Sequence, residues 1–171
     1  MDARTDRGRR EVVVEVTLIV LGTLKEGYWR DAAAEYEKRL GAFCRIKVLQ
    51  LKEERLSDNP NEAEIRQALE KEAAKIMAEI PPRAYRIAMC VEGKQLSSEE
   101  LAEQLDRISE SHGEVCMIIG SSFGLADSVK HACHMKLSVS KLTFPHQLLR
   151  VLLLETVYRS FNILKGTKYH K

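Results

Sequence analysis

The sequence predicts an α/β fold in which a mostly parallel sheet has helices on both faces. Short runs of apolar and β-branched residues alternate along the chain with longer segments whose apolar side chains recur at helical spacing. Strands separated by helices favour parallel pairing, since each helix carries the chain back to the start of the next strand. The 171 residues, 44% of them hydrophobic, are enough for one domain with an ordinary core.

The first two expected elements are a strand and a helix. Residues 12–21 are apolar and β-branched, which is typical of a buried strand, and Gly22 interrupts the run. Over residues 27–40 the larger side chains recur at helical spacing, and Gly41 supplies a stop signal. The residues that carry this spacing are Trp29, Ala33, Tyr36 and Leu40.

A second strand and a charged helix follow. Residues 45–51 predict the strand. Asn61 can cap the next helix with its side-chain oxygen, and Glu64 adds an acidic first turn. We expect this helix to reach about Ile80, because Pro81 cannot continue it.

The middle of the chain repeats the alternation. Residues 85–91 form a third apolar run, which predicts a buried strand. Ser97 and Glu100 have the spacing of a capping box, so a helix should run from there to about His112. Residues 115–119 then predict a fourth strand.

The last third of the chain completes the alternation. The loop at 120–124 contains two glycines and precedes a short helix from Leu125 to about His134. A fifth strand is expected near residues 137–140. The final helix should start close to Pro145 and end at the glycine at 166.

Composition and charge exclude several classes of protein. The formal net charge of +2 is too small to indicate a nucleic-acid binder by itself, so any RNA affinity must come from local clusters of Lys and Arg. No run approaches the roughly 20 apolar residues that span a bilayer, and no apolar secretion signal is evident, so we expect a cytoplasmic protein. The cysteines form no CxxC pair, and we expect reduced, structural thiols at Cys44, Cys90, Cys116 and Cys133.

The first residues differ in character from the rest of the chain. Residues 1–11 are polar, contain four arginines and show no periodicity. We interpret residues 1–13 as a disordered or mis-annotated N-terminal extension and residues 14–171 as a single domain. An intact-mass measurement on the natively expressed protein would contradict a mis-annotated start if it found Met1.

Candidate ligand-binding residues gather in three loops and in the tail. Ligands of open parallel sheets bind at the carboxyl ends of the strands, where the loops 91–94, 120–124 and 138–147 are expected. None of these loops matches a GxGxxG fingerprint or a GK[ST] phosphate loop. The tail, residues 166–171, sets a phenol, an imidazole and two ammonium groups directly after the last helix, which indicates a site rather than a plain terminus.

Taken together, these segments resemble the RlmH-type ribosomal RNA methyltransferases of the SPOUT superfamily. The resemblance runs from about Val14 to Lys171 and rests on the segments 22–29, 35–40, 143–147 and 169–171 and on the loops at Gly93 and Gly120. It implies a SPOUT-type α/β knot with a C-terminal trefoil knot, a homodimer, and S-adenosylmethionine as cofactor without a metal. It also implies methylation of N3 of a pseudouridine in 23S ribosomal RNA, on the assembled ribosome.

The resemblance also implies which residues bind the cofactor. An adenine ring needs a narrow apolar slot with backbone donors and acceptors at its edge. Carried over by position, the contacts fall on Met89, Gly120, Val139, Ser140, Lys141, Leu142, Thr143 and Phe144. The chain departs from its relatives at Ser121, where they usually have a second glycine, so Gly120 is the safer contact.

The tail and the last helix supply the remaining candidates. Neutral His170 can take the proton that the base must lose, with Tyr169 as its hydrogen-bonding or stacking partner, although water could also accept that proton. We expect phosphate contacts from the basic side chains of Arg150, Arg159, Lys165, Lys168 and Lys171.

Alternatives remain open for several of these assignments. Arg150 and Arg159 share a helix with Glu155, so either could be an ordinary ion-paired residue. The grouping of His131, Cys133 and His134 invites a zinc site but lacks a second ligand cluster, so we expect no metal. A non-catalytic RNA-binding or ribosome-assembly protein with the same fold is the main alternative function. A dinucleotide-binding oxidoreductase is disfavoured because the phosphate fingerprint is missing.

Overall fold

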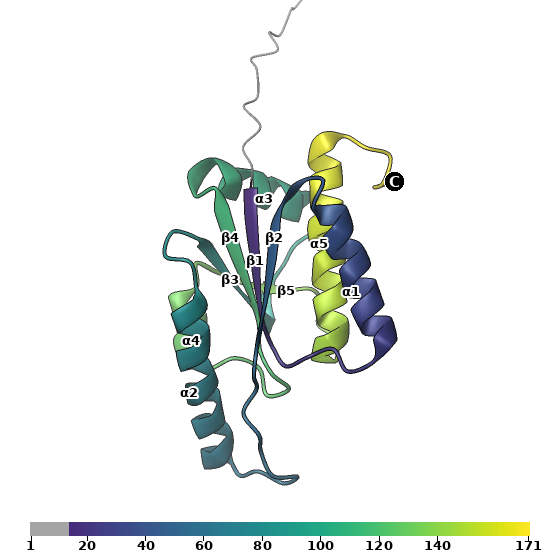
Figure 1. The fold of residues 1–171 in the computed structure, drawn as a ribbon. Helices are drawn as coiled ribbons and strands as arrows, with labels where there is room; N and C mark the ends of the chain where they lie inside the picture. Colours follow the sequence, from purple (N-terminus) through teal and green to yellow (C-terminus); the bar gives the residue numbers. More distant parts are fainter. Residues whose placement is uncertain (1–13) are drawn as a thin grey trace, which may run out of the picture.

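The computed structural model describes residues 14–171, and strands alternate with helices throughout that range (Figure 1). The predicted extension, and with it the first two residues of the first predicted strand, lies outside the described residues. The elements are β1 (Val14–Leu21), α1 (Gly27–Leu40), β2 (Cys44–Leu51), α2 (Glu62–Glu79), β3 (Tyr85–Gln95), α3 (Ser98–Ser111), β4 (Glu114–Ile119), α4 (Asp127–Ala132), β5 (Met135–Ser138) and α5 (His146–Lys165).

The five strands form one sheet with the order β2-β1-β4-β3-β5. Each pairing in this sheet is parallel, which confirms the expected α/β class. Because the strands point the same way, the loops that follow β4, β3 and β5 emerge side by side at one edge of the sheet.

Two apolar clusters cover the two faces of the sheet, with α1, α3 and α5 on one face and α2 and α4 on the other (Figure 1). Successive side chains of a strand point to opposite faces. Leu18 accordingly packs into the first cluster and Ile19 into the second, and both are almost completely buried. Burial on both faces explains why the strands read as continuous apolar runs. None of the helices over residues 14–171 is long and apolar enough to cross a membrane.

The helix ends follow the predicted signals except at Gly41 and in α4, which is shorter than the expected helix from Leu125 to about His134. Both capping boxes form, one from Asn61 to Glu64 and one from Ser97 to Glu100. Gly166 ends α5 in the left-handed conformation, with φ of 67°. Gly41, by contrast, follows α1 with φ of −56°, so that helix ends without the left-handed turn that a glycine stop usually provides.

Strand β3 is longer and less regular than the sequence predicts. Met89 and Lys94 both lie opposite Leu137 of β5, so the residues between them leave the ladder as a bulge. The return to β5 depends on Gly93, because a Cβ atom there would lie 2.6 Å from the carbonyl carbon of Leu137. The bulge therefore takes residues 90–93 out of the ladder with β5, at the edge of the sheet where the loops meet.

Candidate functional site

A cleft of about 900 Å³ lies at the carboxyl ends of β4, β3 and β5. Its size is within the range of small-molecule and cofactor sites. Five segments line it: the bulge of β3, the loop after β4, α4 through Lys130, the loop after β5 and the first turn of α5. The cleft is therefore built from loops that are distant in the sequence and adjacent in the sheet.

Seven of the eight predicted cofactor residues line this cleft. They are Met89, Gly120, Val139, Ser140, Leu142, Thr143 and Phe144, whereas Lys141 is exposed and does not line it. The folded chain thus brings together three segments that the sequence separates by up to about fifty residues. Their role in binding stays a prediction.

The loop after β5 is held in shape by its own serines. Ser138 Oγ donates to the carbonyl oxygen of Ser140 at 2.7 Å, and Ser140 Oγ accepts from the backbone N–H of Leu142 at 3.0 Å. These bonds leave Leu142 projecting, 70% exposed, beside the cleft. An apolar side chain held out in this way can cover a flat apolar ligand.

The loop after β4 turns sharply over residues 120–124. The backbone N–H of Gly124 donates to the carbonyl oxygen of Ser121 at 2.8 Å. A Cβ atom at Gly120 would lie 2.2 Å from the carbonyl oxygen of Gly124, so only glycine allows the turn to close. The glycine that we expected to admit a ligand is thus already required by the loop itself.

An ion pair borders the cleft on the side of the β3 bulge. Lys130 Nζ lies 2.5 Å from Glu92 Oε1. This hydrogen bond raises the pKa of Lys130 and lowers the pKa of Glu92, so both groups are charged near neutral pH. Burial raises the pKa of the nearby Cys90 thiol, which makes that side chain a poor nucleophile.

The tail lies at the other end of α5 from the cleft. His146 at the start of α5 lines the cleft, whereas Tyr158 further along packs on Phe43, which precedes β2. The 20 residues of α5 span about 30 Å at 1.5 Å per residue. In Figure 1 the tail, in yellow, leaves the upper end of α5 and turns back beside that end. Within one chain, Tyr169 and His170 therefore do not reach the cleft.

A polar network holds the tail in that position. Tyr169 Oη donates to Glu155 Oε1 at 3.1 Å, and Arg159 contacts the same carboxylate at 2.6 Å. Burial, followed by the bond to Glu155, raises the pKa of Tyr169 to about 12, so the phenol stays protonated. The ring nitrogens of His170 lie 2.9 Å from Glu99 Oε1 and 3.3 Å from Arg159.

The predicted RNA contacts divide into buried and exposed side chains. Arg150 is only 7% exposed and donates to Gln50 Oε1 at 2.7 Å, and burial lowers its pKa. Arg159 pairs with Glu155, as the alternative interpretation expects. The three exposed side chains are Lys165, Lys168 and Lys171. The exposed lysines are therefore better placed than Arg150 to meet a phosphate.

One of the two histidines considered for zinc, His134, has other contacts. His134 Nδ1 accepts from the backbone N–H of Arg86 at 2.9 Å, and its ring stacks on Tyr85 with centroids 4.7 Å apart. Over residues 14–171 no group of three His, Cys, Asp or Glu side chains is arranged to hold a metal ion.

Sequence reasoning missed the contacts of three charged residues around the site. Lys130 gave no signal because it lies on a short helix that looked structural, and Glu92 was included in the candidate loop 91–94 without a role of its own. Glu72, on α2, is buried behind the loop after β4. In a helix whose sequence is rich in charged residues, a buried carboxylate cannot be distinguished from its exposed neighbours by sequence alone.

Known proteins share this architecture. A family model described as "Predicted SPOUT methyltransferase" matches residues 14–170. A "Probable Methyltransferase" from Bordetella pertussis Tohama I is 14% identical, with 88% of this chain and 98% of that chain covered and a TM-score of 0.54. A tRNA methyltransferase from Aquifex aeolicus is 12% identical, with 92% and 73% covered and a TM-score of 0.50. These two likenesses concern the fold, and the family match covers nearly all of the sequence. The chain belongs to the SPOUT methyltransferase family.

Proposed function

We propose that this protein methylates N3 of a pseudouridine in 23S ribosomal RNA, on the assembled ribosome in the cytoplasm. SPOUT methyltransferases use S-adenosylmethionine, and membership of the family establishes the type of reaction. The specific substrate rests on the resemblance of the motifs to the RlmH-type enzymes. The observation that carries the proposal is the gathering of seven motif residues around one cleft.

The cleft suits S-adenosylmethionine in size and chemistry. Met89 and Leu142 offer apolar surfaces for an adenine ring, and the loops at 120–124 and 138–144 offer backbone donors and acceptors for its edge. The bound cofactor would supply an electrophilic methyl group. The chain's own task is then to hold the acceptor nitrogen in line with that group at near-attack distance and to keep water out.

The proton on N3 must also leave, and His170 is our candidate for the base. In the tail network one nitrogen of His170 faces Glu99 and the other faces Arg159, so the imidazole has no free nitrogen for a substrate. We infer that the tail leaves this position during the reaction. In a homodimer, the tail of one subunit could reach the cleft of its partner. This would also explain why the tail and the cleft of one chain lie far apart.

The RNA would be held by basic side chains near the tail. Lys165, Lys168 and Lys171 are exposed and have no competing carboxylate within the described contacts. If the partner's tail completes each cleft, these lysines lie along the path from the tail to the reacting base. Phosphate contacts of this kind position the RNA without reading its sequence.

The test is methyl transfer to ribosomes isolated from a strain that lacks this gene. Radiolabelled S-adenosylmethionine is supplied, and the nucleosides of the large-subunit RNA are analysed. We expect the label in 3-methylpseudouridine. Label in another nucleoside would replace the proposed substrate, and absence of label with cofactor binding intact would point to an acceptor other than ribosomal RNA. Absence of both would favour a non-catalytic RNA-binding protein.

A further inference from the structure

Glu72 is a buried carboxylate outside the cleft. It lies on α2, is 3% exposed, and shares the buried face of that helix with Ala68, Ala73 and Ile76. Burying a charged group among apolar side chains costs free energy unless hydrogen bonds compensate for lost water. The position therefore calls for an explanation that packing does not give.

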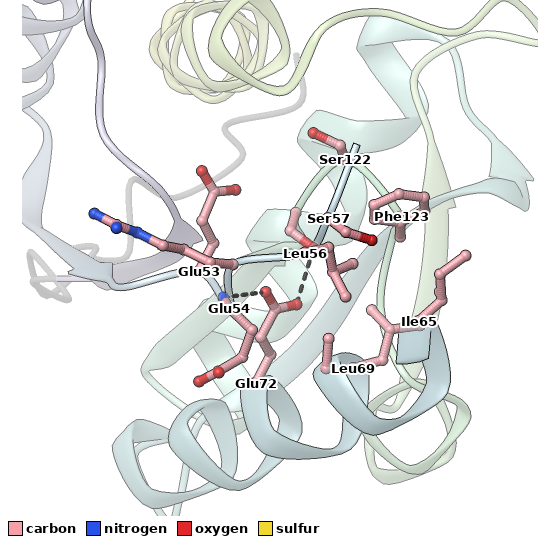
Figure 2. Close-up of a pocket in the computed structure, with 12 residues that line it drawn as sticks. Glu53, Glu54, Leu56, Ser57, Ile65, Leu69, Glu72, Ser122 and Phe123 are labelled. Carbon is pink, nitrogen blue, oxygen red and sulfur yellow. Dashed lines mark hydrogen bonds between the residues drawn. The ribbon is translucent and has the colours of Figure 1, made fainter. Parts of the chain in front are cut away.

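Both oxygens of this carboxylate are engaged by loops. Glu72 Oε1 accepts from the backbone N–H of Glu54 at 2.9 Å, in the segment after β2. Glu72 Oε2 accepts from the hydroxyl of Ser121 at 2.9 Å, in the loop after β4. Figure 2 shows the Glu72 side chain reaching up from α2, with dashed lines marking these bonds. A single side chain thus connects two loops that are far apart in sequence.

The loop after β4 lies between two hollows, of which the first is the cleft. A second hollow of about 320 Å³ lies behind it, bordered by α2 and the segment after β2 (Figure 2). Ser121, Ser122 and Phe123 line both this hollow and the cleft. Phe123 is 47% exposed, so this loop is not buried in the core and packing alone holds it weakly.

We propose that Glu72 is a positioning residue for the cofactor, acting through the Ser121 hydroxyl on the loop that forms one side of the cleft. The inference rests on the proposed cofactor site. The carboxylate holds Ser121 from behind, while the steric fit of Gly120 against Gly124 fixes the turn from within. Hydrogen bonds to an ionised acceptor are stronger than neutral ones, which suits a link that must hold an exposed loop.

The first variant to make is Ser121→Ala, with Ser57→Ala as the matched control. Ser57 is exposed and lines the second hollow but not the cleft. We expect Ser121→Ala to weaken S-adenosylmethionine binding about tenfold, as loss of one charge-assisted hydrogen bond predicts. Ser57→Ala should bind S-adenosylmethionine with an affinity within about twofold of that of the unmodified protein. Binding is measured by titration calorimetry at a temperature where circular dichroism shows every variant folded.

A second measurement does not depend on the cofactor. Amide hydrogen exchange in the free protein should speed up over residues 120–125 in Ser121→Ala and stay unchanged there in Ser57→Ala, because only the former removes a bond that holds this loop. Unchanged exchange and unchanged affinity in Ser121→Ala would overturn the proposal. Faster exchange with weaker binding would support it.

Substitutions at Glu72 separate positioning from simple burial. Glu72→Gln can keep both bonds, since its carbonyl can accept from the N–H of Glu54 and its amide can donate to the Ser121 oxygen. With Ser121 kept, Glu72→Gln should bind S-adenosylmethionine with an affinity within about threefold of that of the unmodified protein. Glu72→Ala should lose about as much affinity as Ser121→Ala. Adding Ser121→Ala to Glu72→Ala should then cause little further loss. Additive losses would overturn the proposal.

The outcomes also distinguish this inference from the proposed function. An unmodified protein that binds S-adenosylmethionine but does not methylate ribosomal RNA would overturn the substrate, and the Ser121 and Glu72 variants would still decide the inference. An unmodified protein that binds no S-adenosylmethionine would overturn both.

Discussion

The Nε2 atom of His170 lies 2.9 Å from Oε1 of Glu99, although 71 residues separate them in the sequence. The contact joins the tail to the first turn of α3, and it lowers the pKa of the Glu99 carboxyl. The tail is thus docked on its own chain at a place remote from the cleft. Within one chain, anything that the tail contributes to methyl transfer must follow its release from this contact.

Removing Tyr169 to Lys171 should separate cofactor binding from catalysis. The cleft contains none of these residues, so we expect the affinity for S-adenosylmethionine to stay within about twofold. Methylation should fall by about 100-fold or more, the usual contribution of a general base. Calorimetry and a single-turnover assay measure the two quantities. Equal loss of both would mean that the tail mainly holds the fold.

Gly120→Ala should damage the cleft through sterics. The added Cβ would collide with the carbonyl oxygen of Gly124, so the turn must open. We expect a loss of about 2 kcal/mol in the free energy of unfolding, typical of overpacking, together with a large loss of cofactor affinity. Gly27→Ala is the control, because its added methyl group would meet only the flexible end of Arg30 at 3.6 Å. An unchanged affinity for S-adenosylmethionine in Gly120→Ala would contradict this steric explanation.

Much of the fold could be predicted because its signals are local. The capping pairs at Asn61 and Ser97 and the left-handed glycine at 166 fix helix ends through neighbours three or four residues away. The alternation of strands and helices predicted the parallel sheet. The strand order could not be predicted, because pairing between β1 and β4 depends on packing between residues about a hundred positions apart.

The candidate site shows the same division. The motif residues that line the cleft were found by resemblance, and the fold explains why they meet. The bulge after Met89 and the fit of Gly120 against Gly124 could not be predicted, since each is a close approach between backbone segments. Glu72 escaped notice because its burial depends on two loops that local periodicity does not place.

Arg150→Ala and Lys168→Ala should affect different properties. Arg150 is buried and bonded to Gln50, so its loss should lower the free energy of unfolding by about 2 kcal/mol through lost packing and an unpaired amide. Lys168 is exposed, so its loss should leave stability within about 0.5 kcal/mol.

RNA binding provides the second readout for this pair. Lys168→Ala should weaken binding to large-subunit RNA and reduce the slope of log affinity against log salt by about 1, as expected for one lost phosphate contact. Arg150→Ala should leave that slope unchanged. An equal reduction of the slope in Arg150→Ala would show that the buried arginine reaches the RNA after all.

His134 should make stability depend on pH. Burial, the positive charge of Arg86 and the nearby His112 lower the pKa of His134 below 6.5. Its Nδ1 accepts from the N–H of Arg86, so the folded chain favours the neutral ring. The unfolded chain then binds the proton more readily. This contribution to stability is fully present above about pH 6.5 and is lost as the pH falls through the lowered folded value.

The variant His134→Asn isolates this effect. The side-chain oxygen of Asn can accept from the same backbone N–H, but the group does not titrate. Urea unfolding at about pH 5.5 and about pH 7.5 gives the free energy of unfolding of both proteins. We expect the unmodified protein to lose more stability than His134→Asn on acidification, since the two proteins differ in no other ionisable group. If both proteins lost the same free energy of unfolding on acidification, protonation of His134 would not oppose folding. The ring would then turn to free its nitrogen while keeping its stack on Tyr85.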